Sequence, residues 1–230
     1  MSKPKKTKAI SELTRHQVLD AAWQLIAQDG RADVGLSDIA RAAGVSRQTV
    51  FYAFGNRAGV LTAMVRHKDA QTGHVERLRS HMMAEDPTLE TLLAAVGAWL
   101  DYLPHIYPVG ILLDAASLTD AEAAEAWNDR MVGALRGGFE VLCARLHASG
   151  AYAGTPKELA GEVWAQVHPT MWRRLVVECG WSKRKFRESR LRLISGLFAE
   201  AVPTPPSAAR APRAKSPARK TRGSTRPAKK

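Results

Sequence analysis

Residues 37–54, with the sequence SDIARAAGVSRQTVFYAF, constrain the fold of this chain more than any other stretch. Two short helical patterns lie on either side of Gly44, and this spacing is typical of a helix-turn-helix unit, in which two helices cross steeply. The apolar or small positions are Ile39, Ala40, Ala43, Val45 and Val50. Ala40 leaves room for the second helix, and Gly44 can take the positive φ that the turn requires.

The polar residues of this unit predict its caps and its outer surface. Ser37 and Ser46 are expected to be N-caps, each accepting a hydrogen bond from an amide of the first turn. The outward side chains of the second helix belong to types that contact base edges or phosphates in a major groove. They are Arg47, Gln48, Thr49, Phe51 and Tyr52. The alternative interpretation is an ordinary helical hairpin within a core, but spacing, caps and outward chemistry agree on a DNA-reading unit.

The formal charge of +12 lies at the two ends of the chain. Residues 1–8 hold four lysines and no acid, residues 203–230 hold nine Lys or Arg and no acid, and residues 9–202 hold 21 basic against 22 acidic groups. Both ends are expected to be disordered and to contact DNA without sequence preference, or else only to keep the protein in solution. The residues expected to make these contacts are Lys5, Lys6, Lys8, Arg219, Lys220 and Arg222.

Other compositional signals exclude several classes of protein. Two cysteines are too few for a disulfide framework and favour a reducing compartment. The longest apolar run, residues 92–100, is about half a membrane span, and the charged N-terminus lacks an apolar h-region. We therefore expect a cytoplasmic, nucleoid-associated protein with no membrane partner.

Motifs of enzyme chemistry are missing from the sequence. It contains no Walker phosphate loop, dinucleotide glycine fingerprint, HExxH or Gly-x-Ser-x-Gly, so we expect neither an enzyme nor a cofactor. His67, His74 and His81 are expected to share one face of a single helix over residues 56–84. Seven residues of helix rise about 10 Å, which is too far for two of them to hold one ion, so no metal site is expected.

The rest of the chain up to residue 202 also shows helical periodicity. A first helix is expected over 13–28, with Thr14 as a possible N-cap and Gly30 as its stop. A helix should start at residues 86–87, Pro104 and Pro108 should bracket a broken stretch, and a helix from Asp120 should reach residue 147. The last two apolar-faced helices should begin at residues 155 and 182, the first interrupted at residues 168–169.

Residues 10–64 resemble the DNA-binding domain of the tetracycline-repressor (TetR) family. The resemblance rests on residues 21–26 of the first helix, on LSDIARAAGVSRQTVFYAF and on NRAGVL. The family's run of Ser, Thr, an apolar residue, an aromatic residue and a late Phe matches Ser46, Thr49, Val50, Phe51 and Phe54. The resemblance implies that Arg57 contacts a phosphate in place of the family's Lys. At Phe51 the family usually has Tyr, so one hydroxyl contact to phosphate is absent.

The resemblance also implies an architecture and a mode of action. The fold is expected to be all-α, with a three-helix helix-turn-helix head (residues 11–58) and a helical ligand-binding and dimerisation body (59–202), flanked by a basic arm (1–10) and a basic tail (203–230). Such a protein is a ligand-responsive repressor, a homodimer through its last two helices, on a palindromic site in double-stranded DNA. An unidentified small-molecule effector enters the body and tilts the fourth helix. The pocket candidates are Trp99, Tyr102, His105, Trp127, Trp164 and His168.

Two other functions remain open at the level of the sequence. The first is a nucleoid-type architectural protein that binds many DNA sites through its basic ends and has no effector. The second is an enzyme or a ligand carrier with a vestigial head. The last two helices also have an alternative role, which is to complete the core of a monomer.

Overall fold

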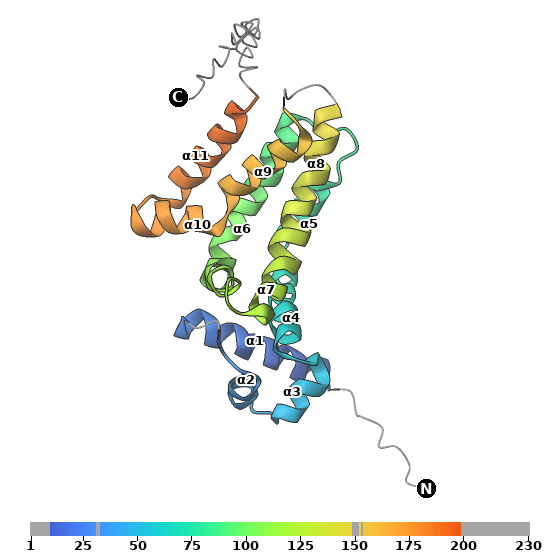
Figure 1. The fold of residues 1–230 in the computed structure, drawn as a ribbon, viewed down its shortest axis with the longest axis vertical. Helices are drawn as coiled ribbons and strands as arrows, with labels where there is room; N and C mark the ends of the chain where they lie inside the picture. The colour runs from blue at the N-terminus through green and yellow to red at the C-terminus, as the bar shows by residue number, and fades with distance from the viewer. Residues whose placement is uncertain (1–9, 31–32, 149–151, 153, 199–230) are drawn as a thin grey trace, which may run out of the picture. The chain divides into compact units, whose positions relative to one another are not determined.

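The computed structural model describes residues 10–30, 33–148, 152 and 154–198. This part of the chain is all-α, as the sequence predicts, and contains no strand (Figure 1). In chain order its helices are α1 (Glu12–Asp29), α2 (Leu36–Ala42), α3 (Arg47–Phe54), α4 (Arg57–Ala70), α5 (His74–Met82), α6 (Leu89–Ala116), α7 (Ala121–Trp127), the π-helix η1 (Asn128–Arg136), α8 (Gly137–Ala148), α9 (Pro156–Val167), α10 (Pro169–Trp172), the π-helix η2 (Arg173–Glu178) and α11 (Lys183–Gly196).

The helix-turn-helix is formed by α2 and α3, and α2 packs against α1. Ile26, Ile39 and Val50, one from each helix, are fully buried and belong to the apolar core. Gly44, in the turn, has a φ of +66°, which a residue with a Cβ rarely adopts. The Ser46 hydroxyl accepts a hydrogen bond from the amide of Thr49 at 3.0 Å. The turn glycine and the Ser46 cap are therefore confirmed.

Two predicted N-caps are wrong. Ser37 lies inside the first turn of α2, whose N-cap is Gly35, and the Asp38 carboxylate accepts a hydrogen bond from the Gly35 amide at 3.4 Å. The N-cap of α1 is Ser11, whose hydroxyl accepts a bond from the Thr14 amide at 3.1 Å. Both helices begin further upstream than predicted. Asp38, in the first turn of α2, bonds to the Gly35 amide, and Ser11, before α1, bonds to the Thr14 amide.

The single helix predicted over residues 56–84 is two helices, α4 and α5. The Thr72 amide and hydroxyl both donate to the carbonyl of Asp69, at 3.3 and 3.2 Å, which closes a tight turn at the end of α4. Gly73 follows as the N-cap of α5 and weakens helix continuation. The break also corrects the prediction that three histidines share one face, since His67 lies on α4 and His74 on α5.

Helix α6 is continuous where a broken stretch was predicted. Pro104 and Pro108 lie inside it, and its N-cap is Thr88 rather than the residues at 86–87. Each proline removes one backbone hydrogen bond. Burial of the apolar face against α5, α7 and α11 outweighs that loss, because tertiary packing supplies most helix stability in a folded protein.

The helix predicted from Asp120 to residue 147 exists, but its middle is a π-helix. Asp120 caps it, accepting bonds from the amides of Glu122 and Ala123 at 3.0 and 3.1 Å. Three elements follow without a break, namely α7, η1 and α8, and α-helical geometry resumes at Gly137. Gly137 and Gly138 thus begin α8, directly after the π-helix.

The last helices begin and break as predicted. Thr155 caps α9 and pairs with Glu158, and Ser182 caps α11. His168 has an extended ψ of 142°, so it ends α9 before Pro169 starts α10. The apolar residues Leu159, Val163, Val167, Phe186 and Ile194 are buried within the chain.

Some predictions fall outside the part of the chain that the structure describes. Lys5, Lys6, Lys8, Arg219, Lys220 and Arg222 are among them, as are the arm and the tail that contain them. None of the described helices has both the length and the apolar composition that a membrane span requires. The boundary predicted at residue 58 lies in the first turn of α4, which contacts α1 and α3 as well as α5 and α7, so the division into head and body stays a prediction.

Candidate functional site

The outer surface of α3 carries the residues predicted to read DNA. Arg47 and Gln48 are exposed at its N-terminal end, and Gln48 Nε2 donates to the Tyr52 hydroxyl at 2.8 Å. Phe51 is 51% exposed and Tyr52 is 60% exposed, which is unusual for large aromatic side chains on a short helix. Thr49 is half-buried and contacts Ser46. The helix therefore presents polar and aromatic groups outward while Val50 holds it to the core.

Ser37, a further candidate DNA-binding residue, and Arg57, expected to contact a phosphate, differ in position. Ser37 is exposed on α2. The Arg57 side chain is only 10% exposed: its Nη1 donates to Asp120 Oδ2 at 2.8 Å and its Nε donates to the Val34 carbonyl at 2.9 Å. In this conformation Arg57 ties α4 to the start of α7 and to the loop before α2.

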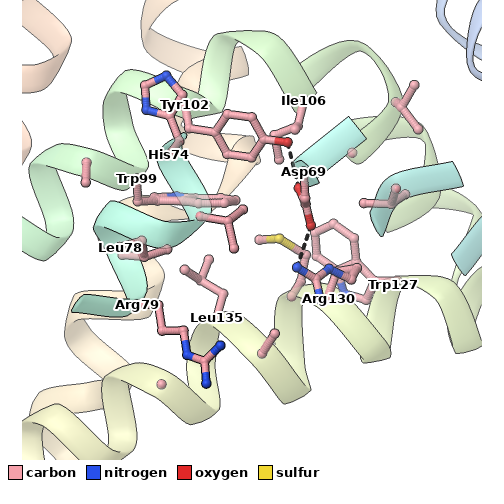
Figure 2. A pocket seen from close by; sticks show the side chains of 18 of the residues that line it. Asp69, His74, Leu78, Arg79, Trp99, Tyr102, Ile106, Trp127, Arg130 and Leu135 are labelled. Atoms are coloured by element: carbon pink, nitrogen blue, oxygen red, sulfur yellow. Dashed lines mark hydrogen bonds and ion pairs between the residues drawn. The ribbon is translucent and has the colours of Figure 1, made fainter. Parts of the chain in front are cut away.

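A partly open cavity of about 330 Å³ lies between α1, α4, α5, α6, α7, η1 and α8 (Figure 2). Its lining is mainly apolar and is contributed by Trp23, Val65, Val75, Leu78, Met82, Met83, Ala98, Trp99, Ile106, Val109, Gly110, Leu113, Ala126, Trp127, Met131, Ala134, Leu135 and Gly138. Polar atoms come from Asp69, His74, Arg79, Tyr102 and Arg130. An apolar space with a few convergent polar groups is the usual form of a small-molecule site.

Three of the six predicted pocket residues line this cavity and three do not. Trp99, Tyr102 and Trp127 are part of its wall. His105 is exposed, while Trp164 and His168 pack edge-to-face on each other with ring centroids 5.1 Å apart. The sequence placed all six in the body, but which side chains face the cavity depends on how the helices pack.

The polar wall of the cavity is a buried cluster of three side chains. The Tyr102 hydroxyl donates to Asp69 Oδ1 at 2.6 Å, and Arg130 Nη2 donates to Asp69 Oδ2 (Figure 2). Burial raises the pKa of the Asp69 carboxyl, although the Arg130 guanidinium and the Tyr102 hydroxyl both act to lower it. Burial also raises the pKa of the Tyr102 hydroxyl, so it stays a hydrogen-bond donor.

His74 adds a neutral aromatic group beside this cluster. Its ring stacks on Tyr102 with centroids 5.4 Å apart, and its Nδ1 lies 2.6 Å from Arg77 Nη2. Burial lowers its pKa, and the positive charges near it, chiefly Arg77, lower it further. The geometry thus favours an uncharged imidazole that accepts a bond from the guanidinium.

His168 has a structural position. Its Nδ1 accepts a hydrogen bond from the Thr170 amide at 3.2 Å, which caps α10, and its ring lies edge-on between Trp127 and Trp164. Burial lowers its pKa, partly opposed by the Asp114 carboxylate 3.7 Å from its Nε2. It caps the helix while it is neutral.

The sequence did not predict that Asp69, Arg79 and Arg130 line the cavity. One signal was present: Asp69 lies in the last turn of α4, where a negative charge opposes the helix dipole. Arg130 lies in η1, and a π-helix often marks a functional site, but no sequence pattern indicated one here. Within the described residues, His, Cys, Asp and Glu form no group of three or more that could hold a metal ion.

Comparison with known proteins supports the predicted helix-turn-helix head and the all-α fold. The sequence profile of the family described as "Bacterial regulatory proteins, tetR family" matches residues 18–64. An uncharacterised HTH-type transcriptional regulator of Mycobacterium tuberculosis is 38% identical over 63 residues, which are 27% of this chain and 31% of the relative. The chain thus aligns with about a third of that relative's length.

Solved structures extend the similarity to the body. The fatty acid degradation regulator FadR from Bacillus halodurans has a TM-score of 0.62 at 22% identity, covering 79% of this chain and 98% of its own. NalD, the secondary repressor of the MexAB-OprM multidrug efflux pump in Pseudomonas aeruginosa, has a TM-score of 0.60 at 24% identity, covering 81% and 96%. At these identities the likeness shows a shared fold. Residues 18–64 thus match the TetR family of bacterial regulatory proteins in sequence, and the described helices share the fold of these solved regulators.

Proposed function

We propose that the protein is a ligand-responsive repressor that binds a palindromic DNA operator as a homodimer. The observation that carries this proposal is the position of α4, which belongs to both candidate sites. It packs against α1 and α3, and its last turn supplies Asp69 to the cavity wall. A ligand that changes the surroundings of Asp69 therefore acts on a helix that also supports the recognition helix.

Polar links along α4 make this coupling direct. Arg57 at its start bonds to Asp120, Arg66 in its second half bonds to Asp129, and Asp69 at its end bonds to Arg130. All three partners lie on η1 or just before α7. A ligand between α6 and η1 that shifts η1 would pull on α4 at several points, and this is how we expect occupancy to reach the head.

The DNA contacts rest on the exposed end of α3. Arg47 and Gln48 are free of the core and have the lengths and donor groups that reach base edges in a major groove. One such helix covers only a few base pairs, so two heads on a two-fold operator are needed for selective binding.

The dimer is proposed through the last helices of the body. Most of their apolar residues are buried within one chain, which on its own favours the alternative that they complete a monomer. Val177 and Leu193 remain 58% and 49% exposed, and they offer apolar surface for a second copy. Sedimentation equilibrium of the full chain tests this: a Leu193→Glu variant should dissociate more readily than an Arg192→Glu control, and equal masses would exclude this face.

Operator selection tests the proposal as a whole. Genomic fragments bound by the full-length protein are sequenced, and affinity for the enriched site is compared with affinity for random DNA at one salt concentration. A repressor should prefer its site by about 10³-fold or more and recover a two-fold sequence. A ratio near one would favour the architectural protein, and no DNA binding at low salt would reject both.

A further inference from the structure

We propose that the cavity takes a small amphiphile with an apolar body and one anionic head group, and that Arg79 at its rim recognises the head. This inference rests on the proposed function only in taking the cavity as the effector site. It adds the chemical class of the ligand and the residue that selects it.

The size and lining of the cavity set the body of the ligand. One water molecule occupies about 30 Å³ in the liquid. At a similar volume for each non-hydrogen atom of a ligand, the cavity of 330 Å³ holds about ten such atoms. Trp99, Trp127, Leu135 and their neighbours offer such a ligand few hydrogen-bonding partners along most of its length. A flexible alkyl or aryl body fits this lining, and removing it from water drives binding.

The charges of the cavity lining determine which charge the head group of the ligand should carry. Asp69 and Arg130 neutralise each other in the wall, and Arg130 Nη1 also lies 4.0 Å from Asp129. Arg79 is exposed and, within the described part of the chain, has no acidic group within ion-pair distance. One cation of the lining is therefore uncompensated, and it favours an anion at the rim.

The surroundings of Arg79 strengthen this preference. Arg77 is a second cation on the same helix, and the lining residue His74, which contacts it, is held neutral, so neither side chain supplies negative charge. Glu76 is the one acid of α5, and it does not line the cavity. The rim formed by α5 is thus positive on the side that faces the ligand.

A cationic ligand directed to Asp69 fits the geometry less well. Asp69 already accepts bonds from Tyr102 and Arg130 and is 7% exposed, so an amine would have to displace the partly buried Arg130 guanidinium. Figure 2 shows Arg79 well apart from the Asp69 cluster. An anion at Arg79 leaves the buried cluster intact.

Calorimetric titration of the full chain with three eight-carbon probes tests the head group. The probes are octanoate, 1-octanol and octylamine, at pH 7.5 and low salt. Octanoate should bind about three- to fivefold more tightly than 1-octanol, the range expected for a partly exposed ion pair, and octylamine more weakly than either. Arg79→Gln should remove the preference for octanoate, whereas Arg192→Gln, at an exposed position on α11, should keep it.

A cavity-filling variant locates the binding. A Cβ at Gly110 meets only Ile106 Cδ1, at 3.6 Å, which is ordinary contact, so Gly110→Leu should fold and occupy cavity space. It should abolish binding of all three probes while circular dichroism stays that of the parent. Octanoate binding that survives in this variant would place the anion elsewhere and overturn the inference.

The remaining outcomes separate this inference from the proposed function. If 1-octanol or octylamine binds best and Gly110→Leu abolishes that binding, the cavity is a ligand site but the anionic class is wrong. An octanoate preference that persists in Arg79→Gln overturns the role of Arg79. If no probe binds, the inference fails, while operator selection still decides whether the protein reads DNA.

Discussion

The recognition surface on α3 and the cavity in the body are built in opposite ways. The surface consists of neighbours within eight residues of one helix, Arg47–Phe54, with side chains that point into solvent. The cavity collects residues from α1 to α8, with Asp69 and Arg130 distant in sequence by 61 positions. A site on one helix depends on local spacing, whereas a site between helices depends on the packing of the whole body.

The two regions should also differ in the effect of a substitution. Replacing an outward side chain of α3 should remove a proposed contact with DNA and leave the fold unchanged. Replacing a member of the cavity cluster leaves a buried polar group unpaired within the protein. The predictions below test this difference, from the largest expected effect to the smallest.

Breaking the buried cluster should cost the most stability. Asp69→Ala leaves the Arg130 guanidinium without its main partner and should lower the free energy of unfolding by about 3 kcal/mol, measured by urea denaturation. The double variant Asp69→Leu with Arg130→Met removes both charges and should lie much closer to wild type. A single variant as stable as wild type would show that the cluster is solvated like a surface pair.

Removing an outward side chain of α3 should act on DNA and not on the fold. Arg47→Ala should weaken binding to the selected operator by about 1–3 kcal/mol and relax base choice at one position per half-site, with the urea midpoint unchanged. Arg41→Ala on α2, where the side chain pairs with Asp38, is the control and should keep base choice. An equal loss of affinity for operator and for random DNA would show that Arg47 contacts a phosphate and not a base.

Protonation of His168 should reduce stability in mild acid. Burial holds its pKa below the ordinary value, so its contribution is present above about pH 6.5 and is lost as pH falls through the lower folded pKa. His168→Asn keeps an acceptor for the Thr170 amide and does not titrate. Between pH 7 and pH 5 the free energy of unfolding, measured by urea denaturation, should fall by about 1 kcal/mol less in the variant than in wild type. Parallel curves for the two proteins would contradict this.

The smallest effect is expected at Phe51. Its ring is half-exposed on α3, so Phe51→Tyr adds a hydroxyl without strain and should strengthen DNA binding a few-fold, about 0.5–1 kcal/mol. Fluorescence anisotropy with the selected operator measures it, and operator and random DNA should gain alike because a phosphate contact carries no sequence information. Unchanged affinity would mean that the ring edge does not approach the backbone of DNA.

The same contrast explains how far the sequence could be interpreted. Gly44, Ser46 and the residues from Arg47 to Tyr52 were predictable because each depends on its own helix or turn. The continuity of α6 through two prolines was not, because its packing outweighs the local cost of proline. The split at Gly73, closed by the local turn from Asp69 to Thr72, and the π-helix η1 were also missed, because apolar periodicity signals neither of them. Asp69, Arg79 and Arg130 lie beside or within these segments, so the sequence did not predict that they line the cavity.

Helix α6 also has a mechanical consequence. It forms one wall of the cavity from Trp99 to Leu113, and the nitrogens of Pro104 and Pro108 have no hydrogen to donate within that wall. The carbonyls one turn before them lose their helical donors, so the wall has two compliant points about one turn apart while its ends remain bonded. If the cavity takes a ligand, as proposed, bending at the middle of α6 would let it accommodate ligands of different girth without loosening the packing at either end of the helix.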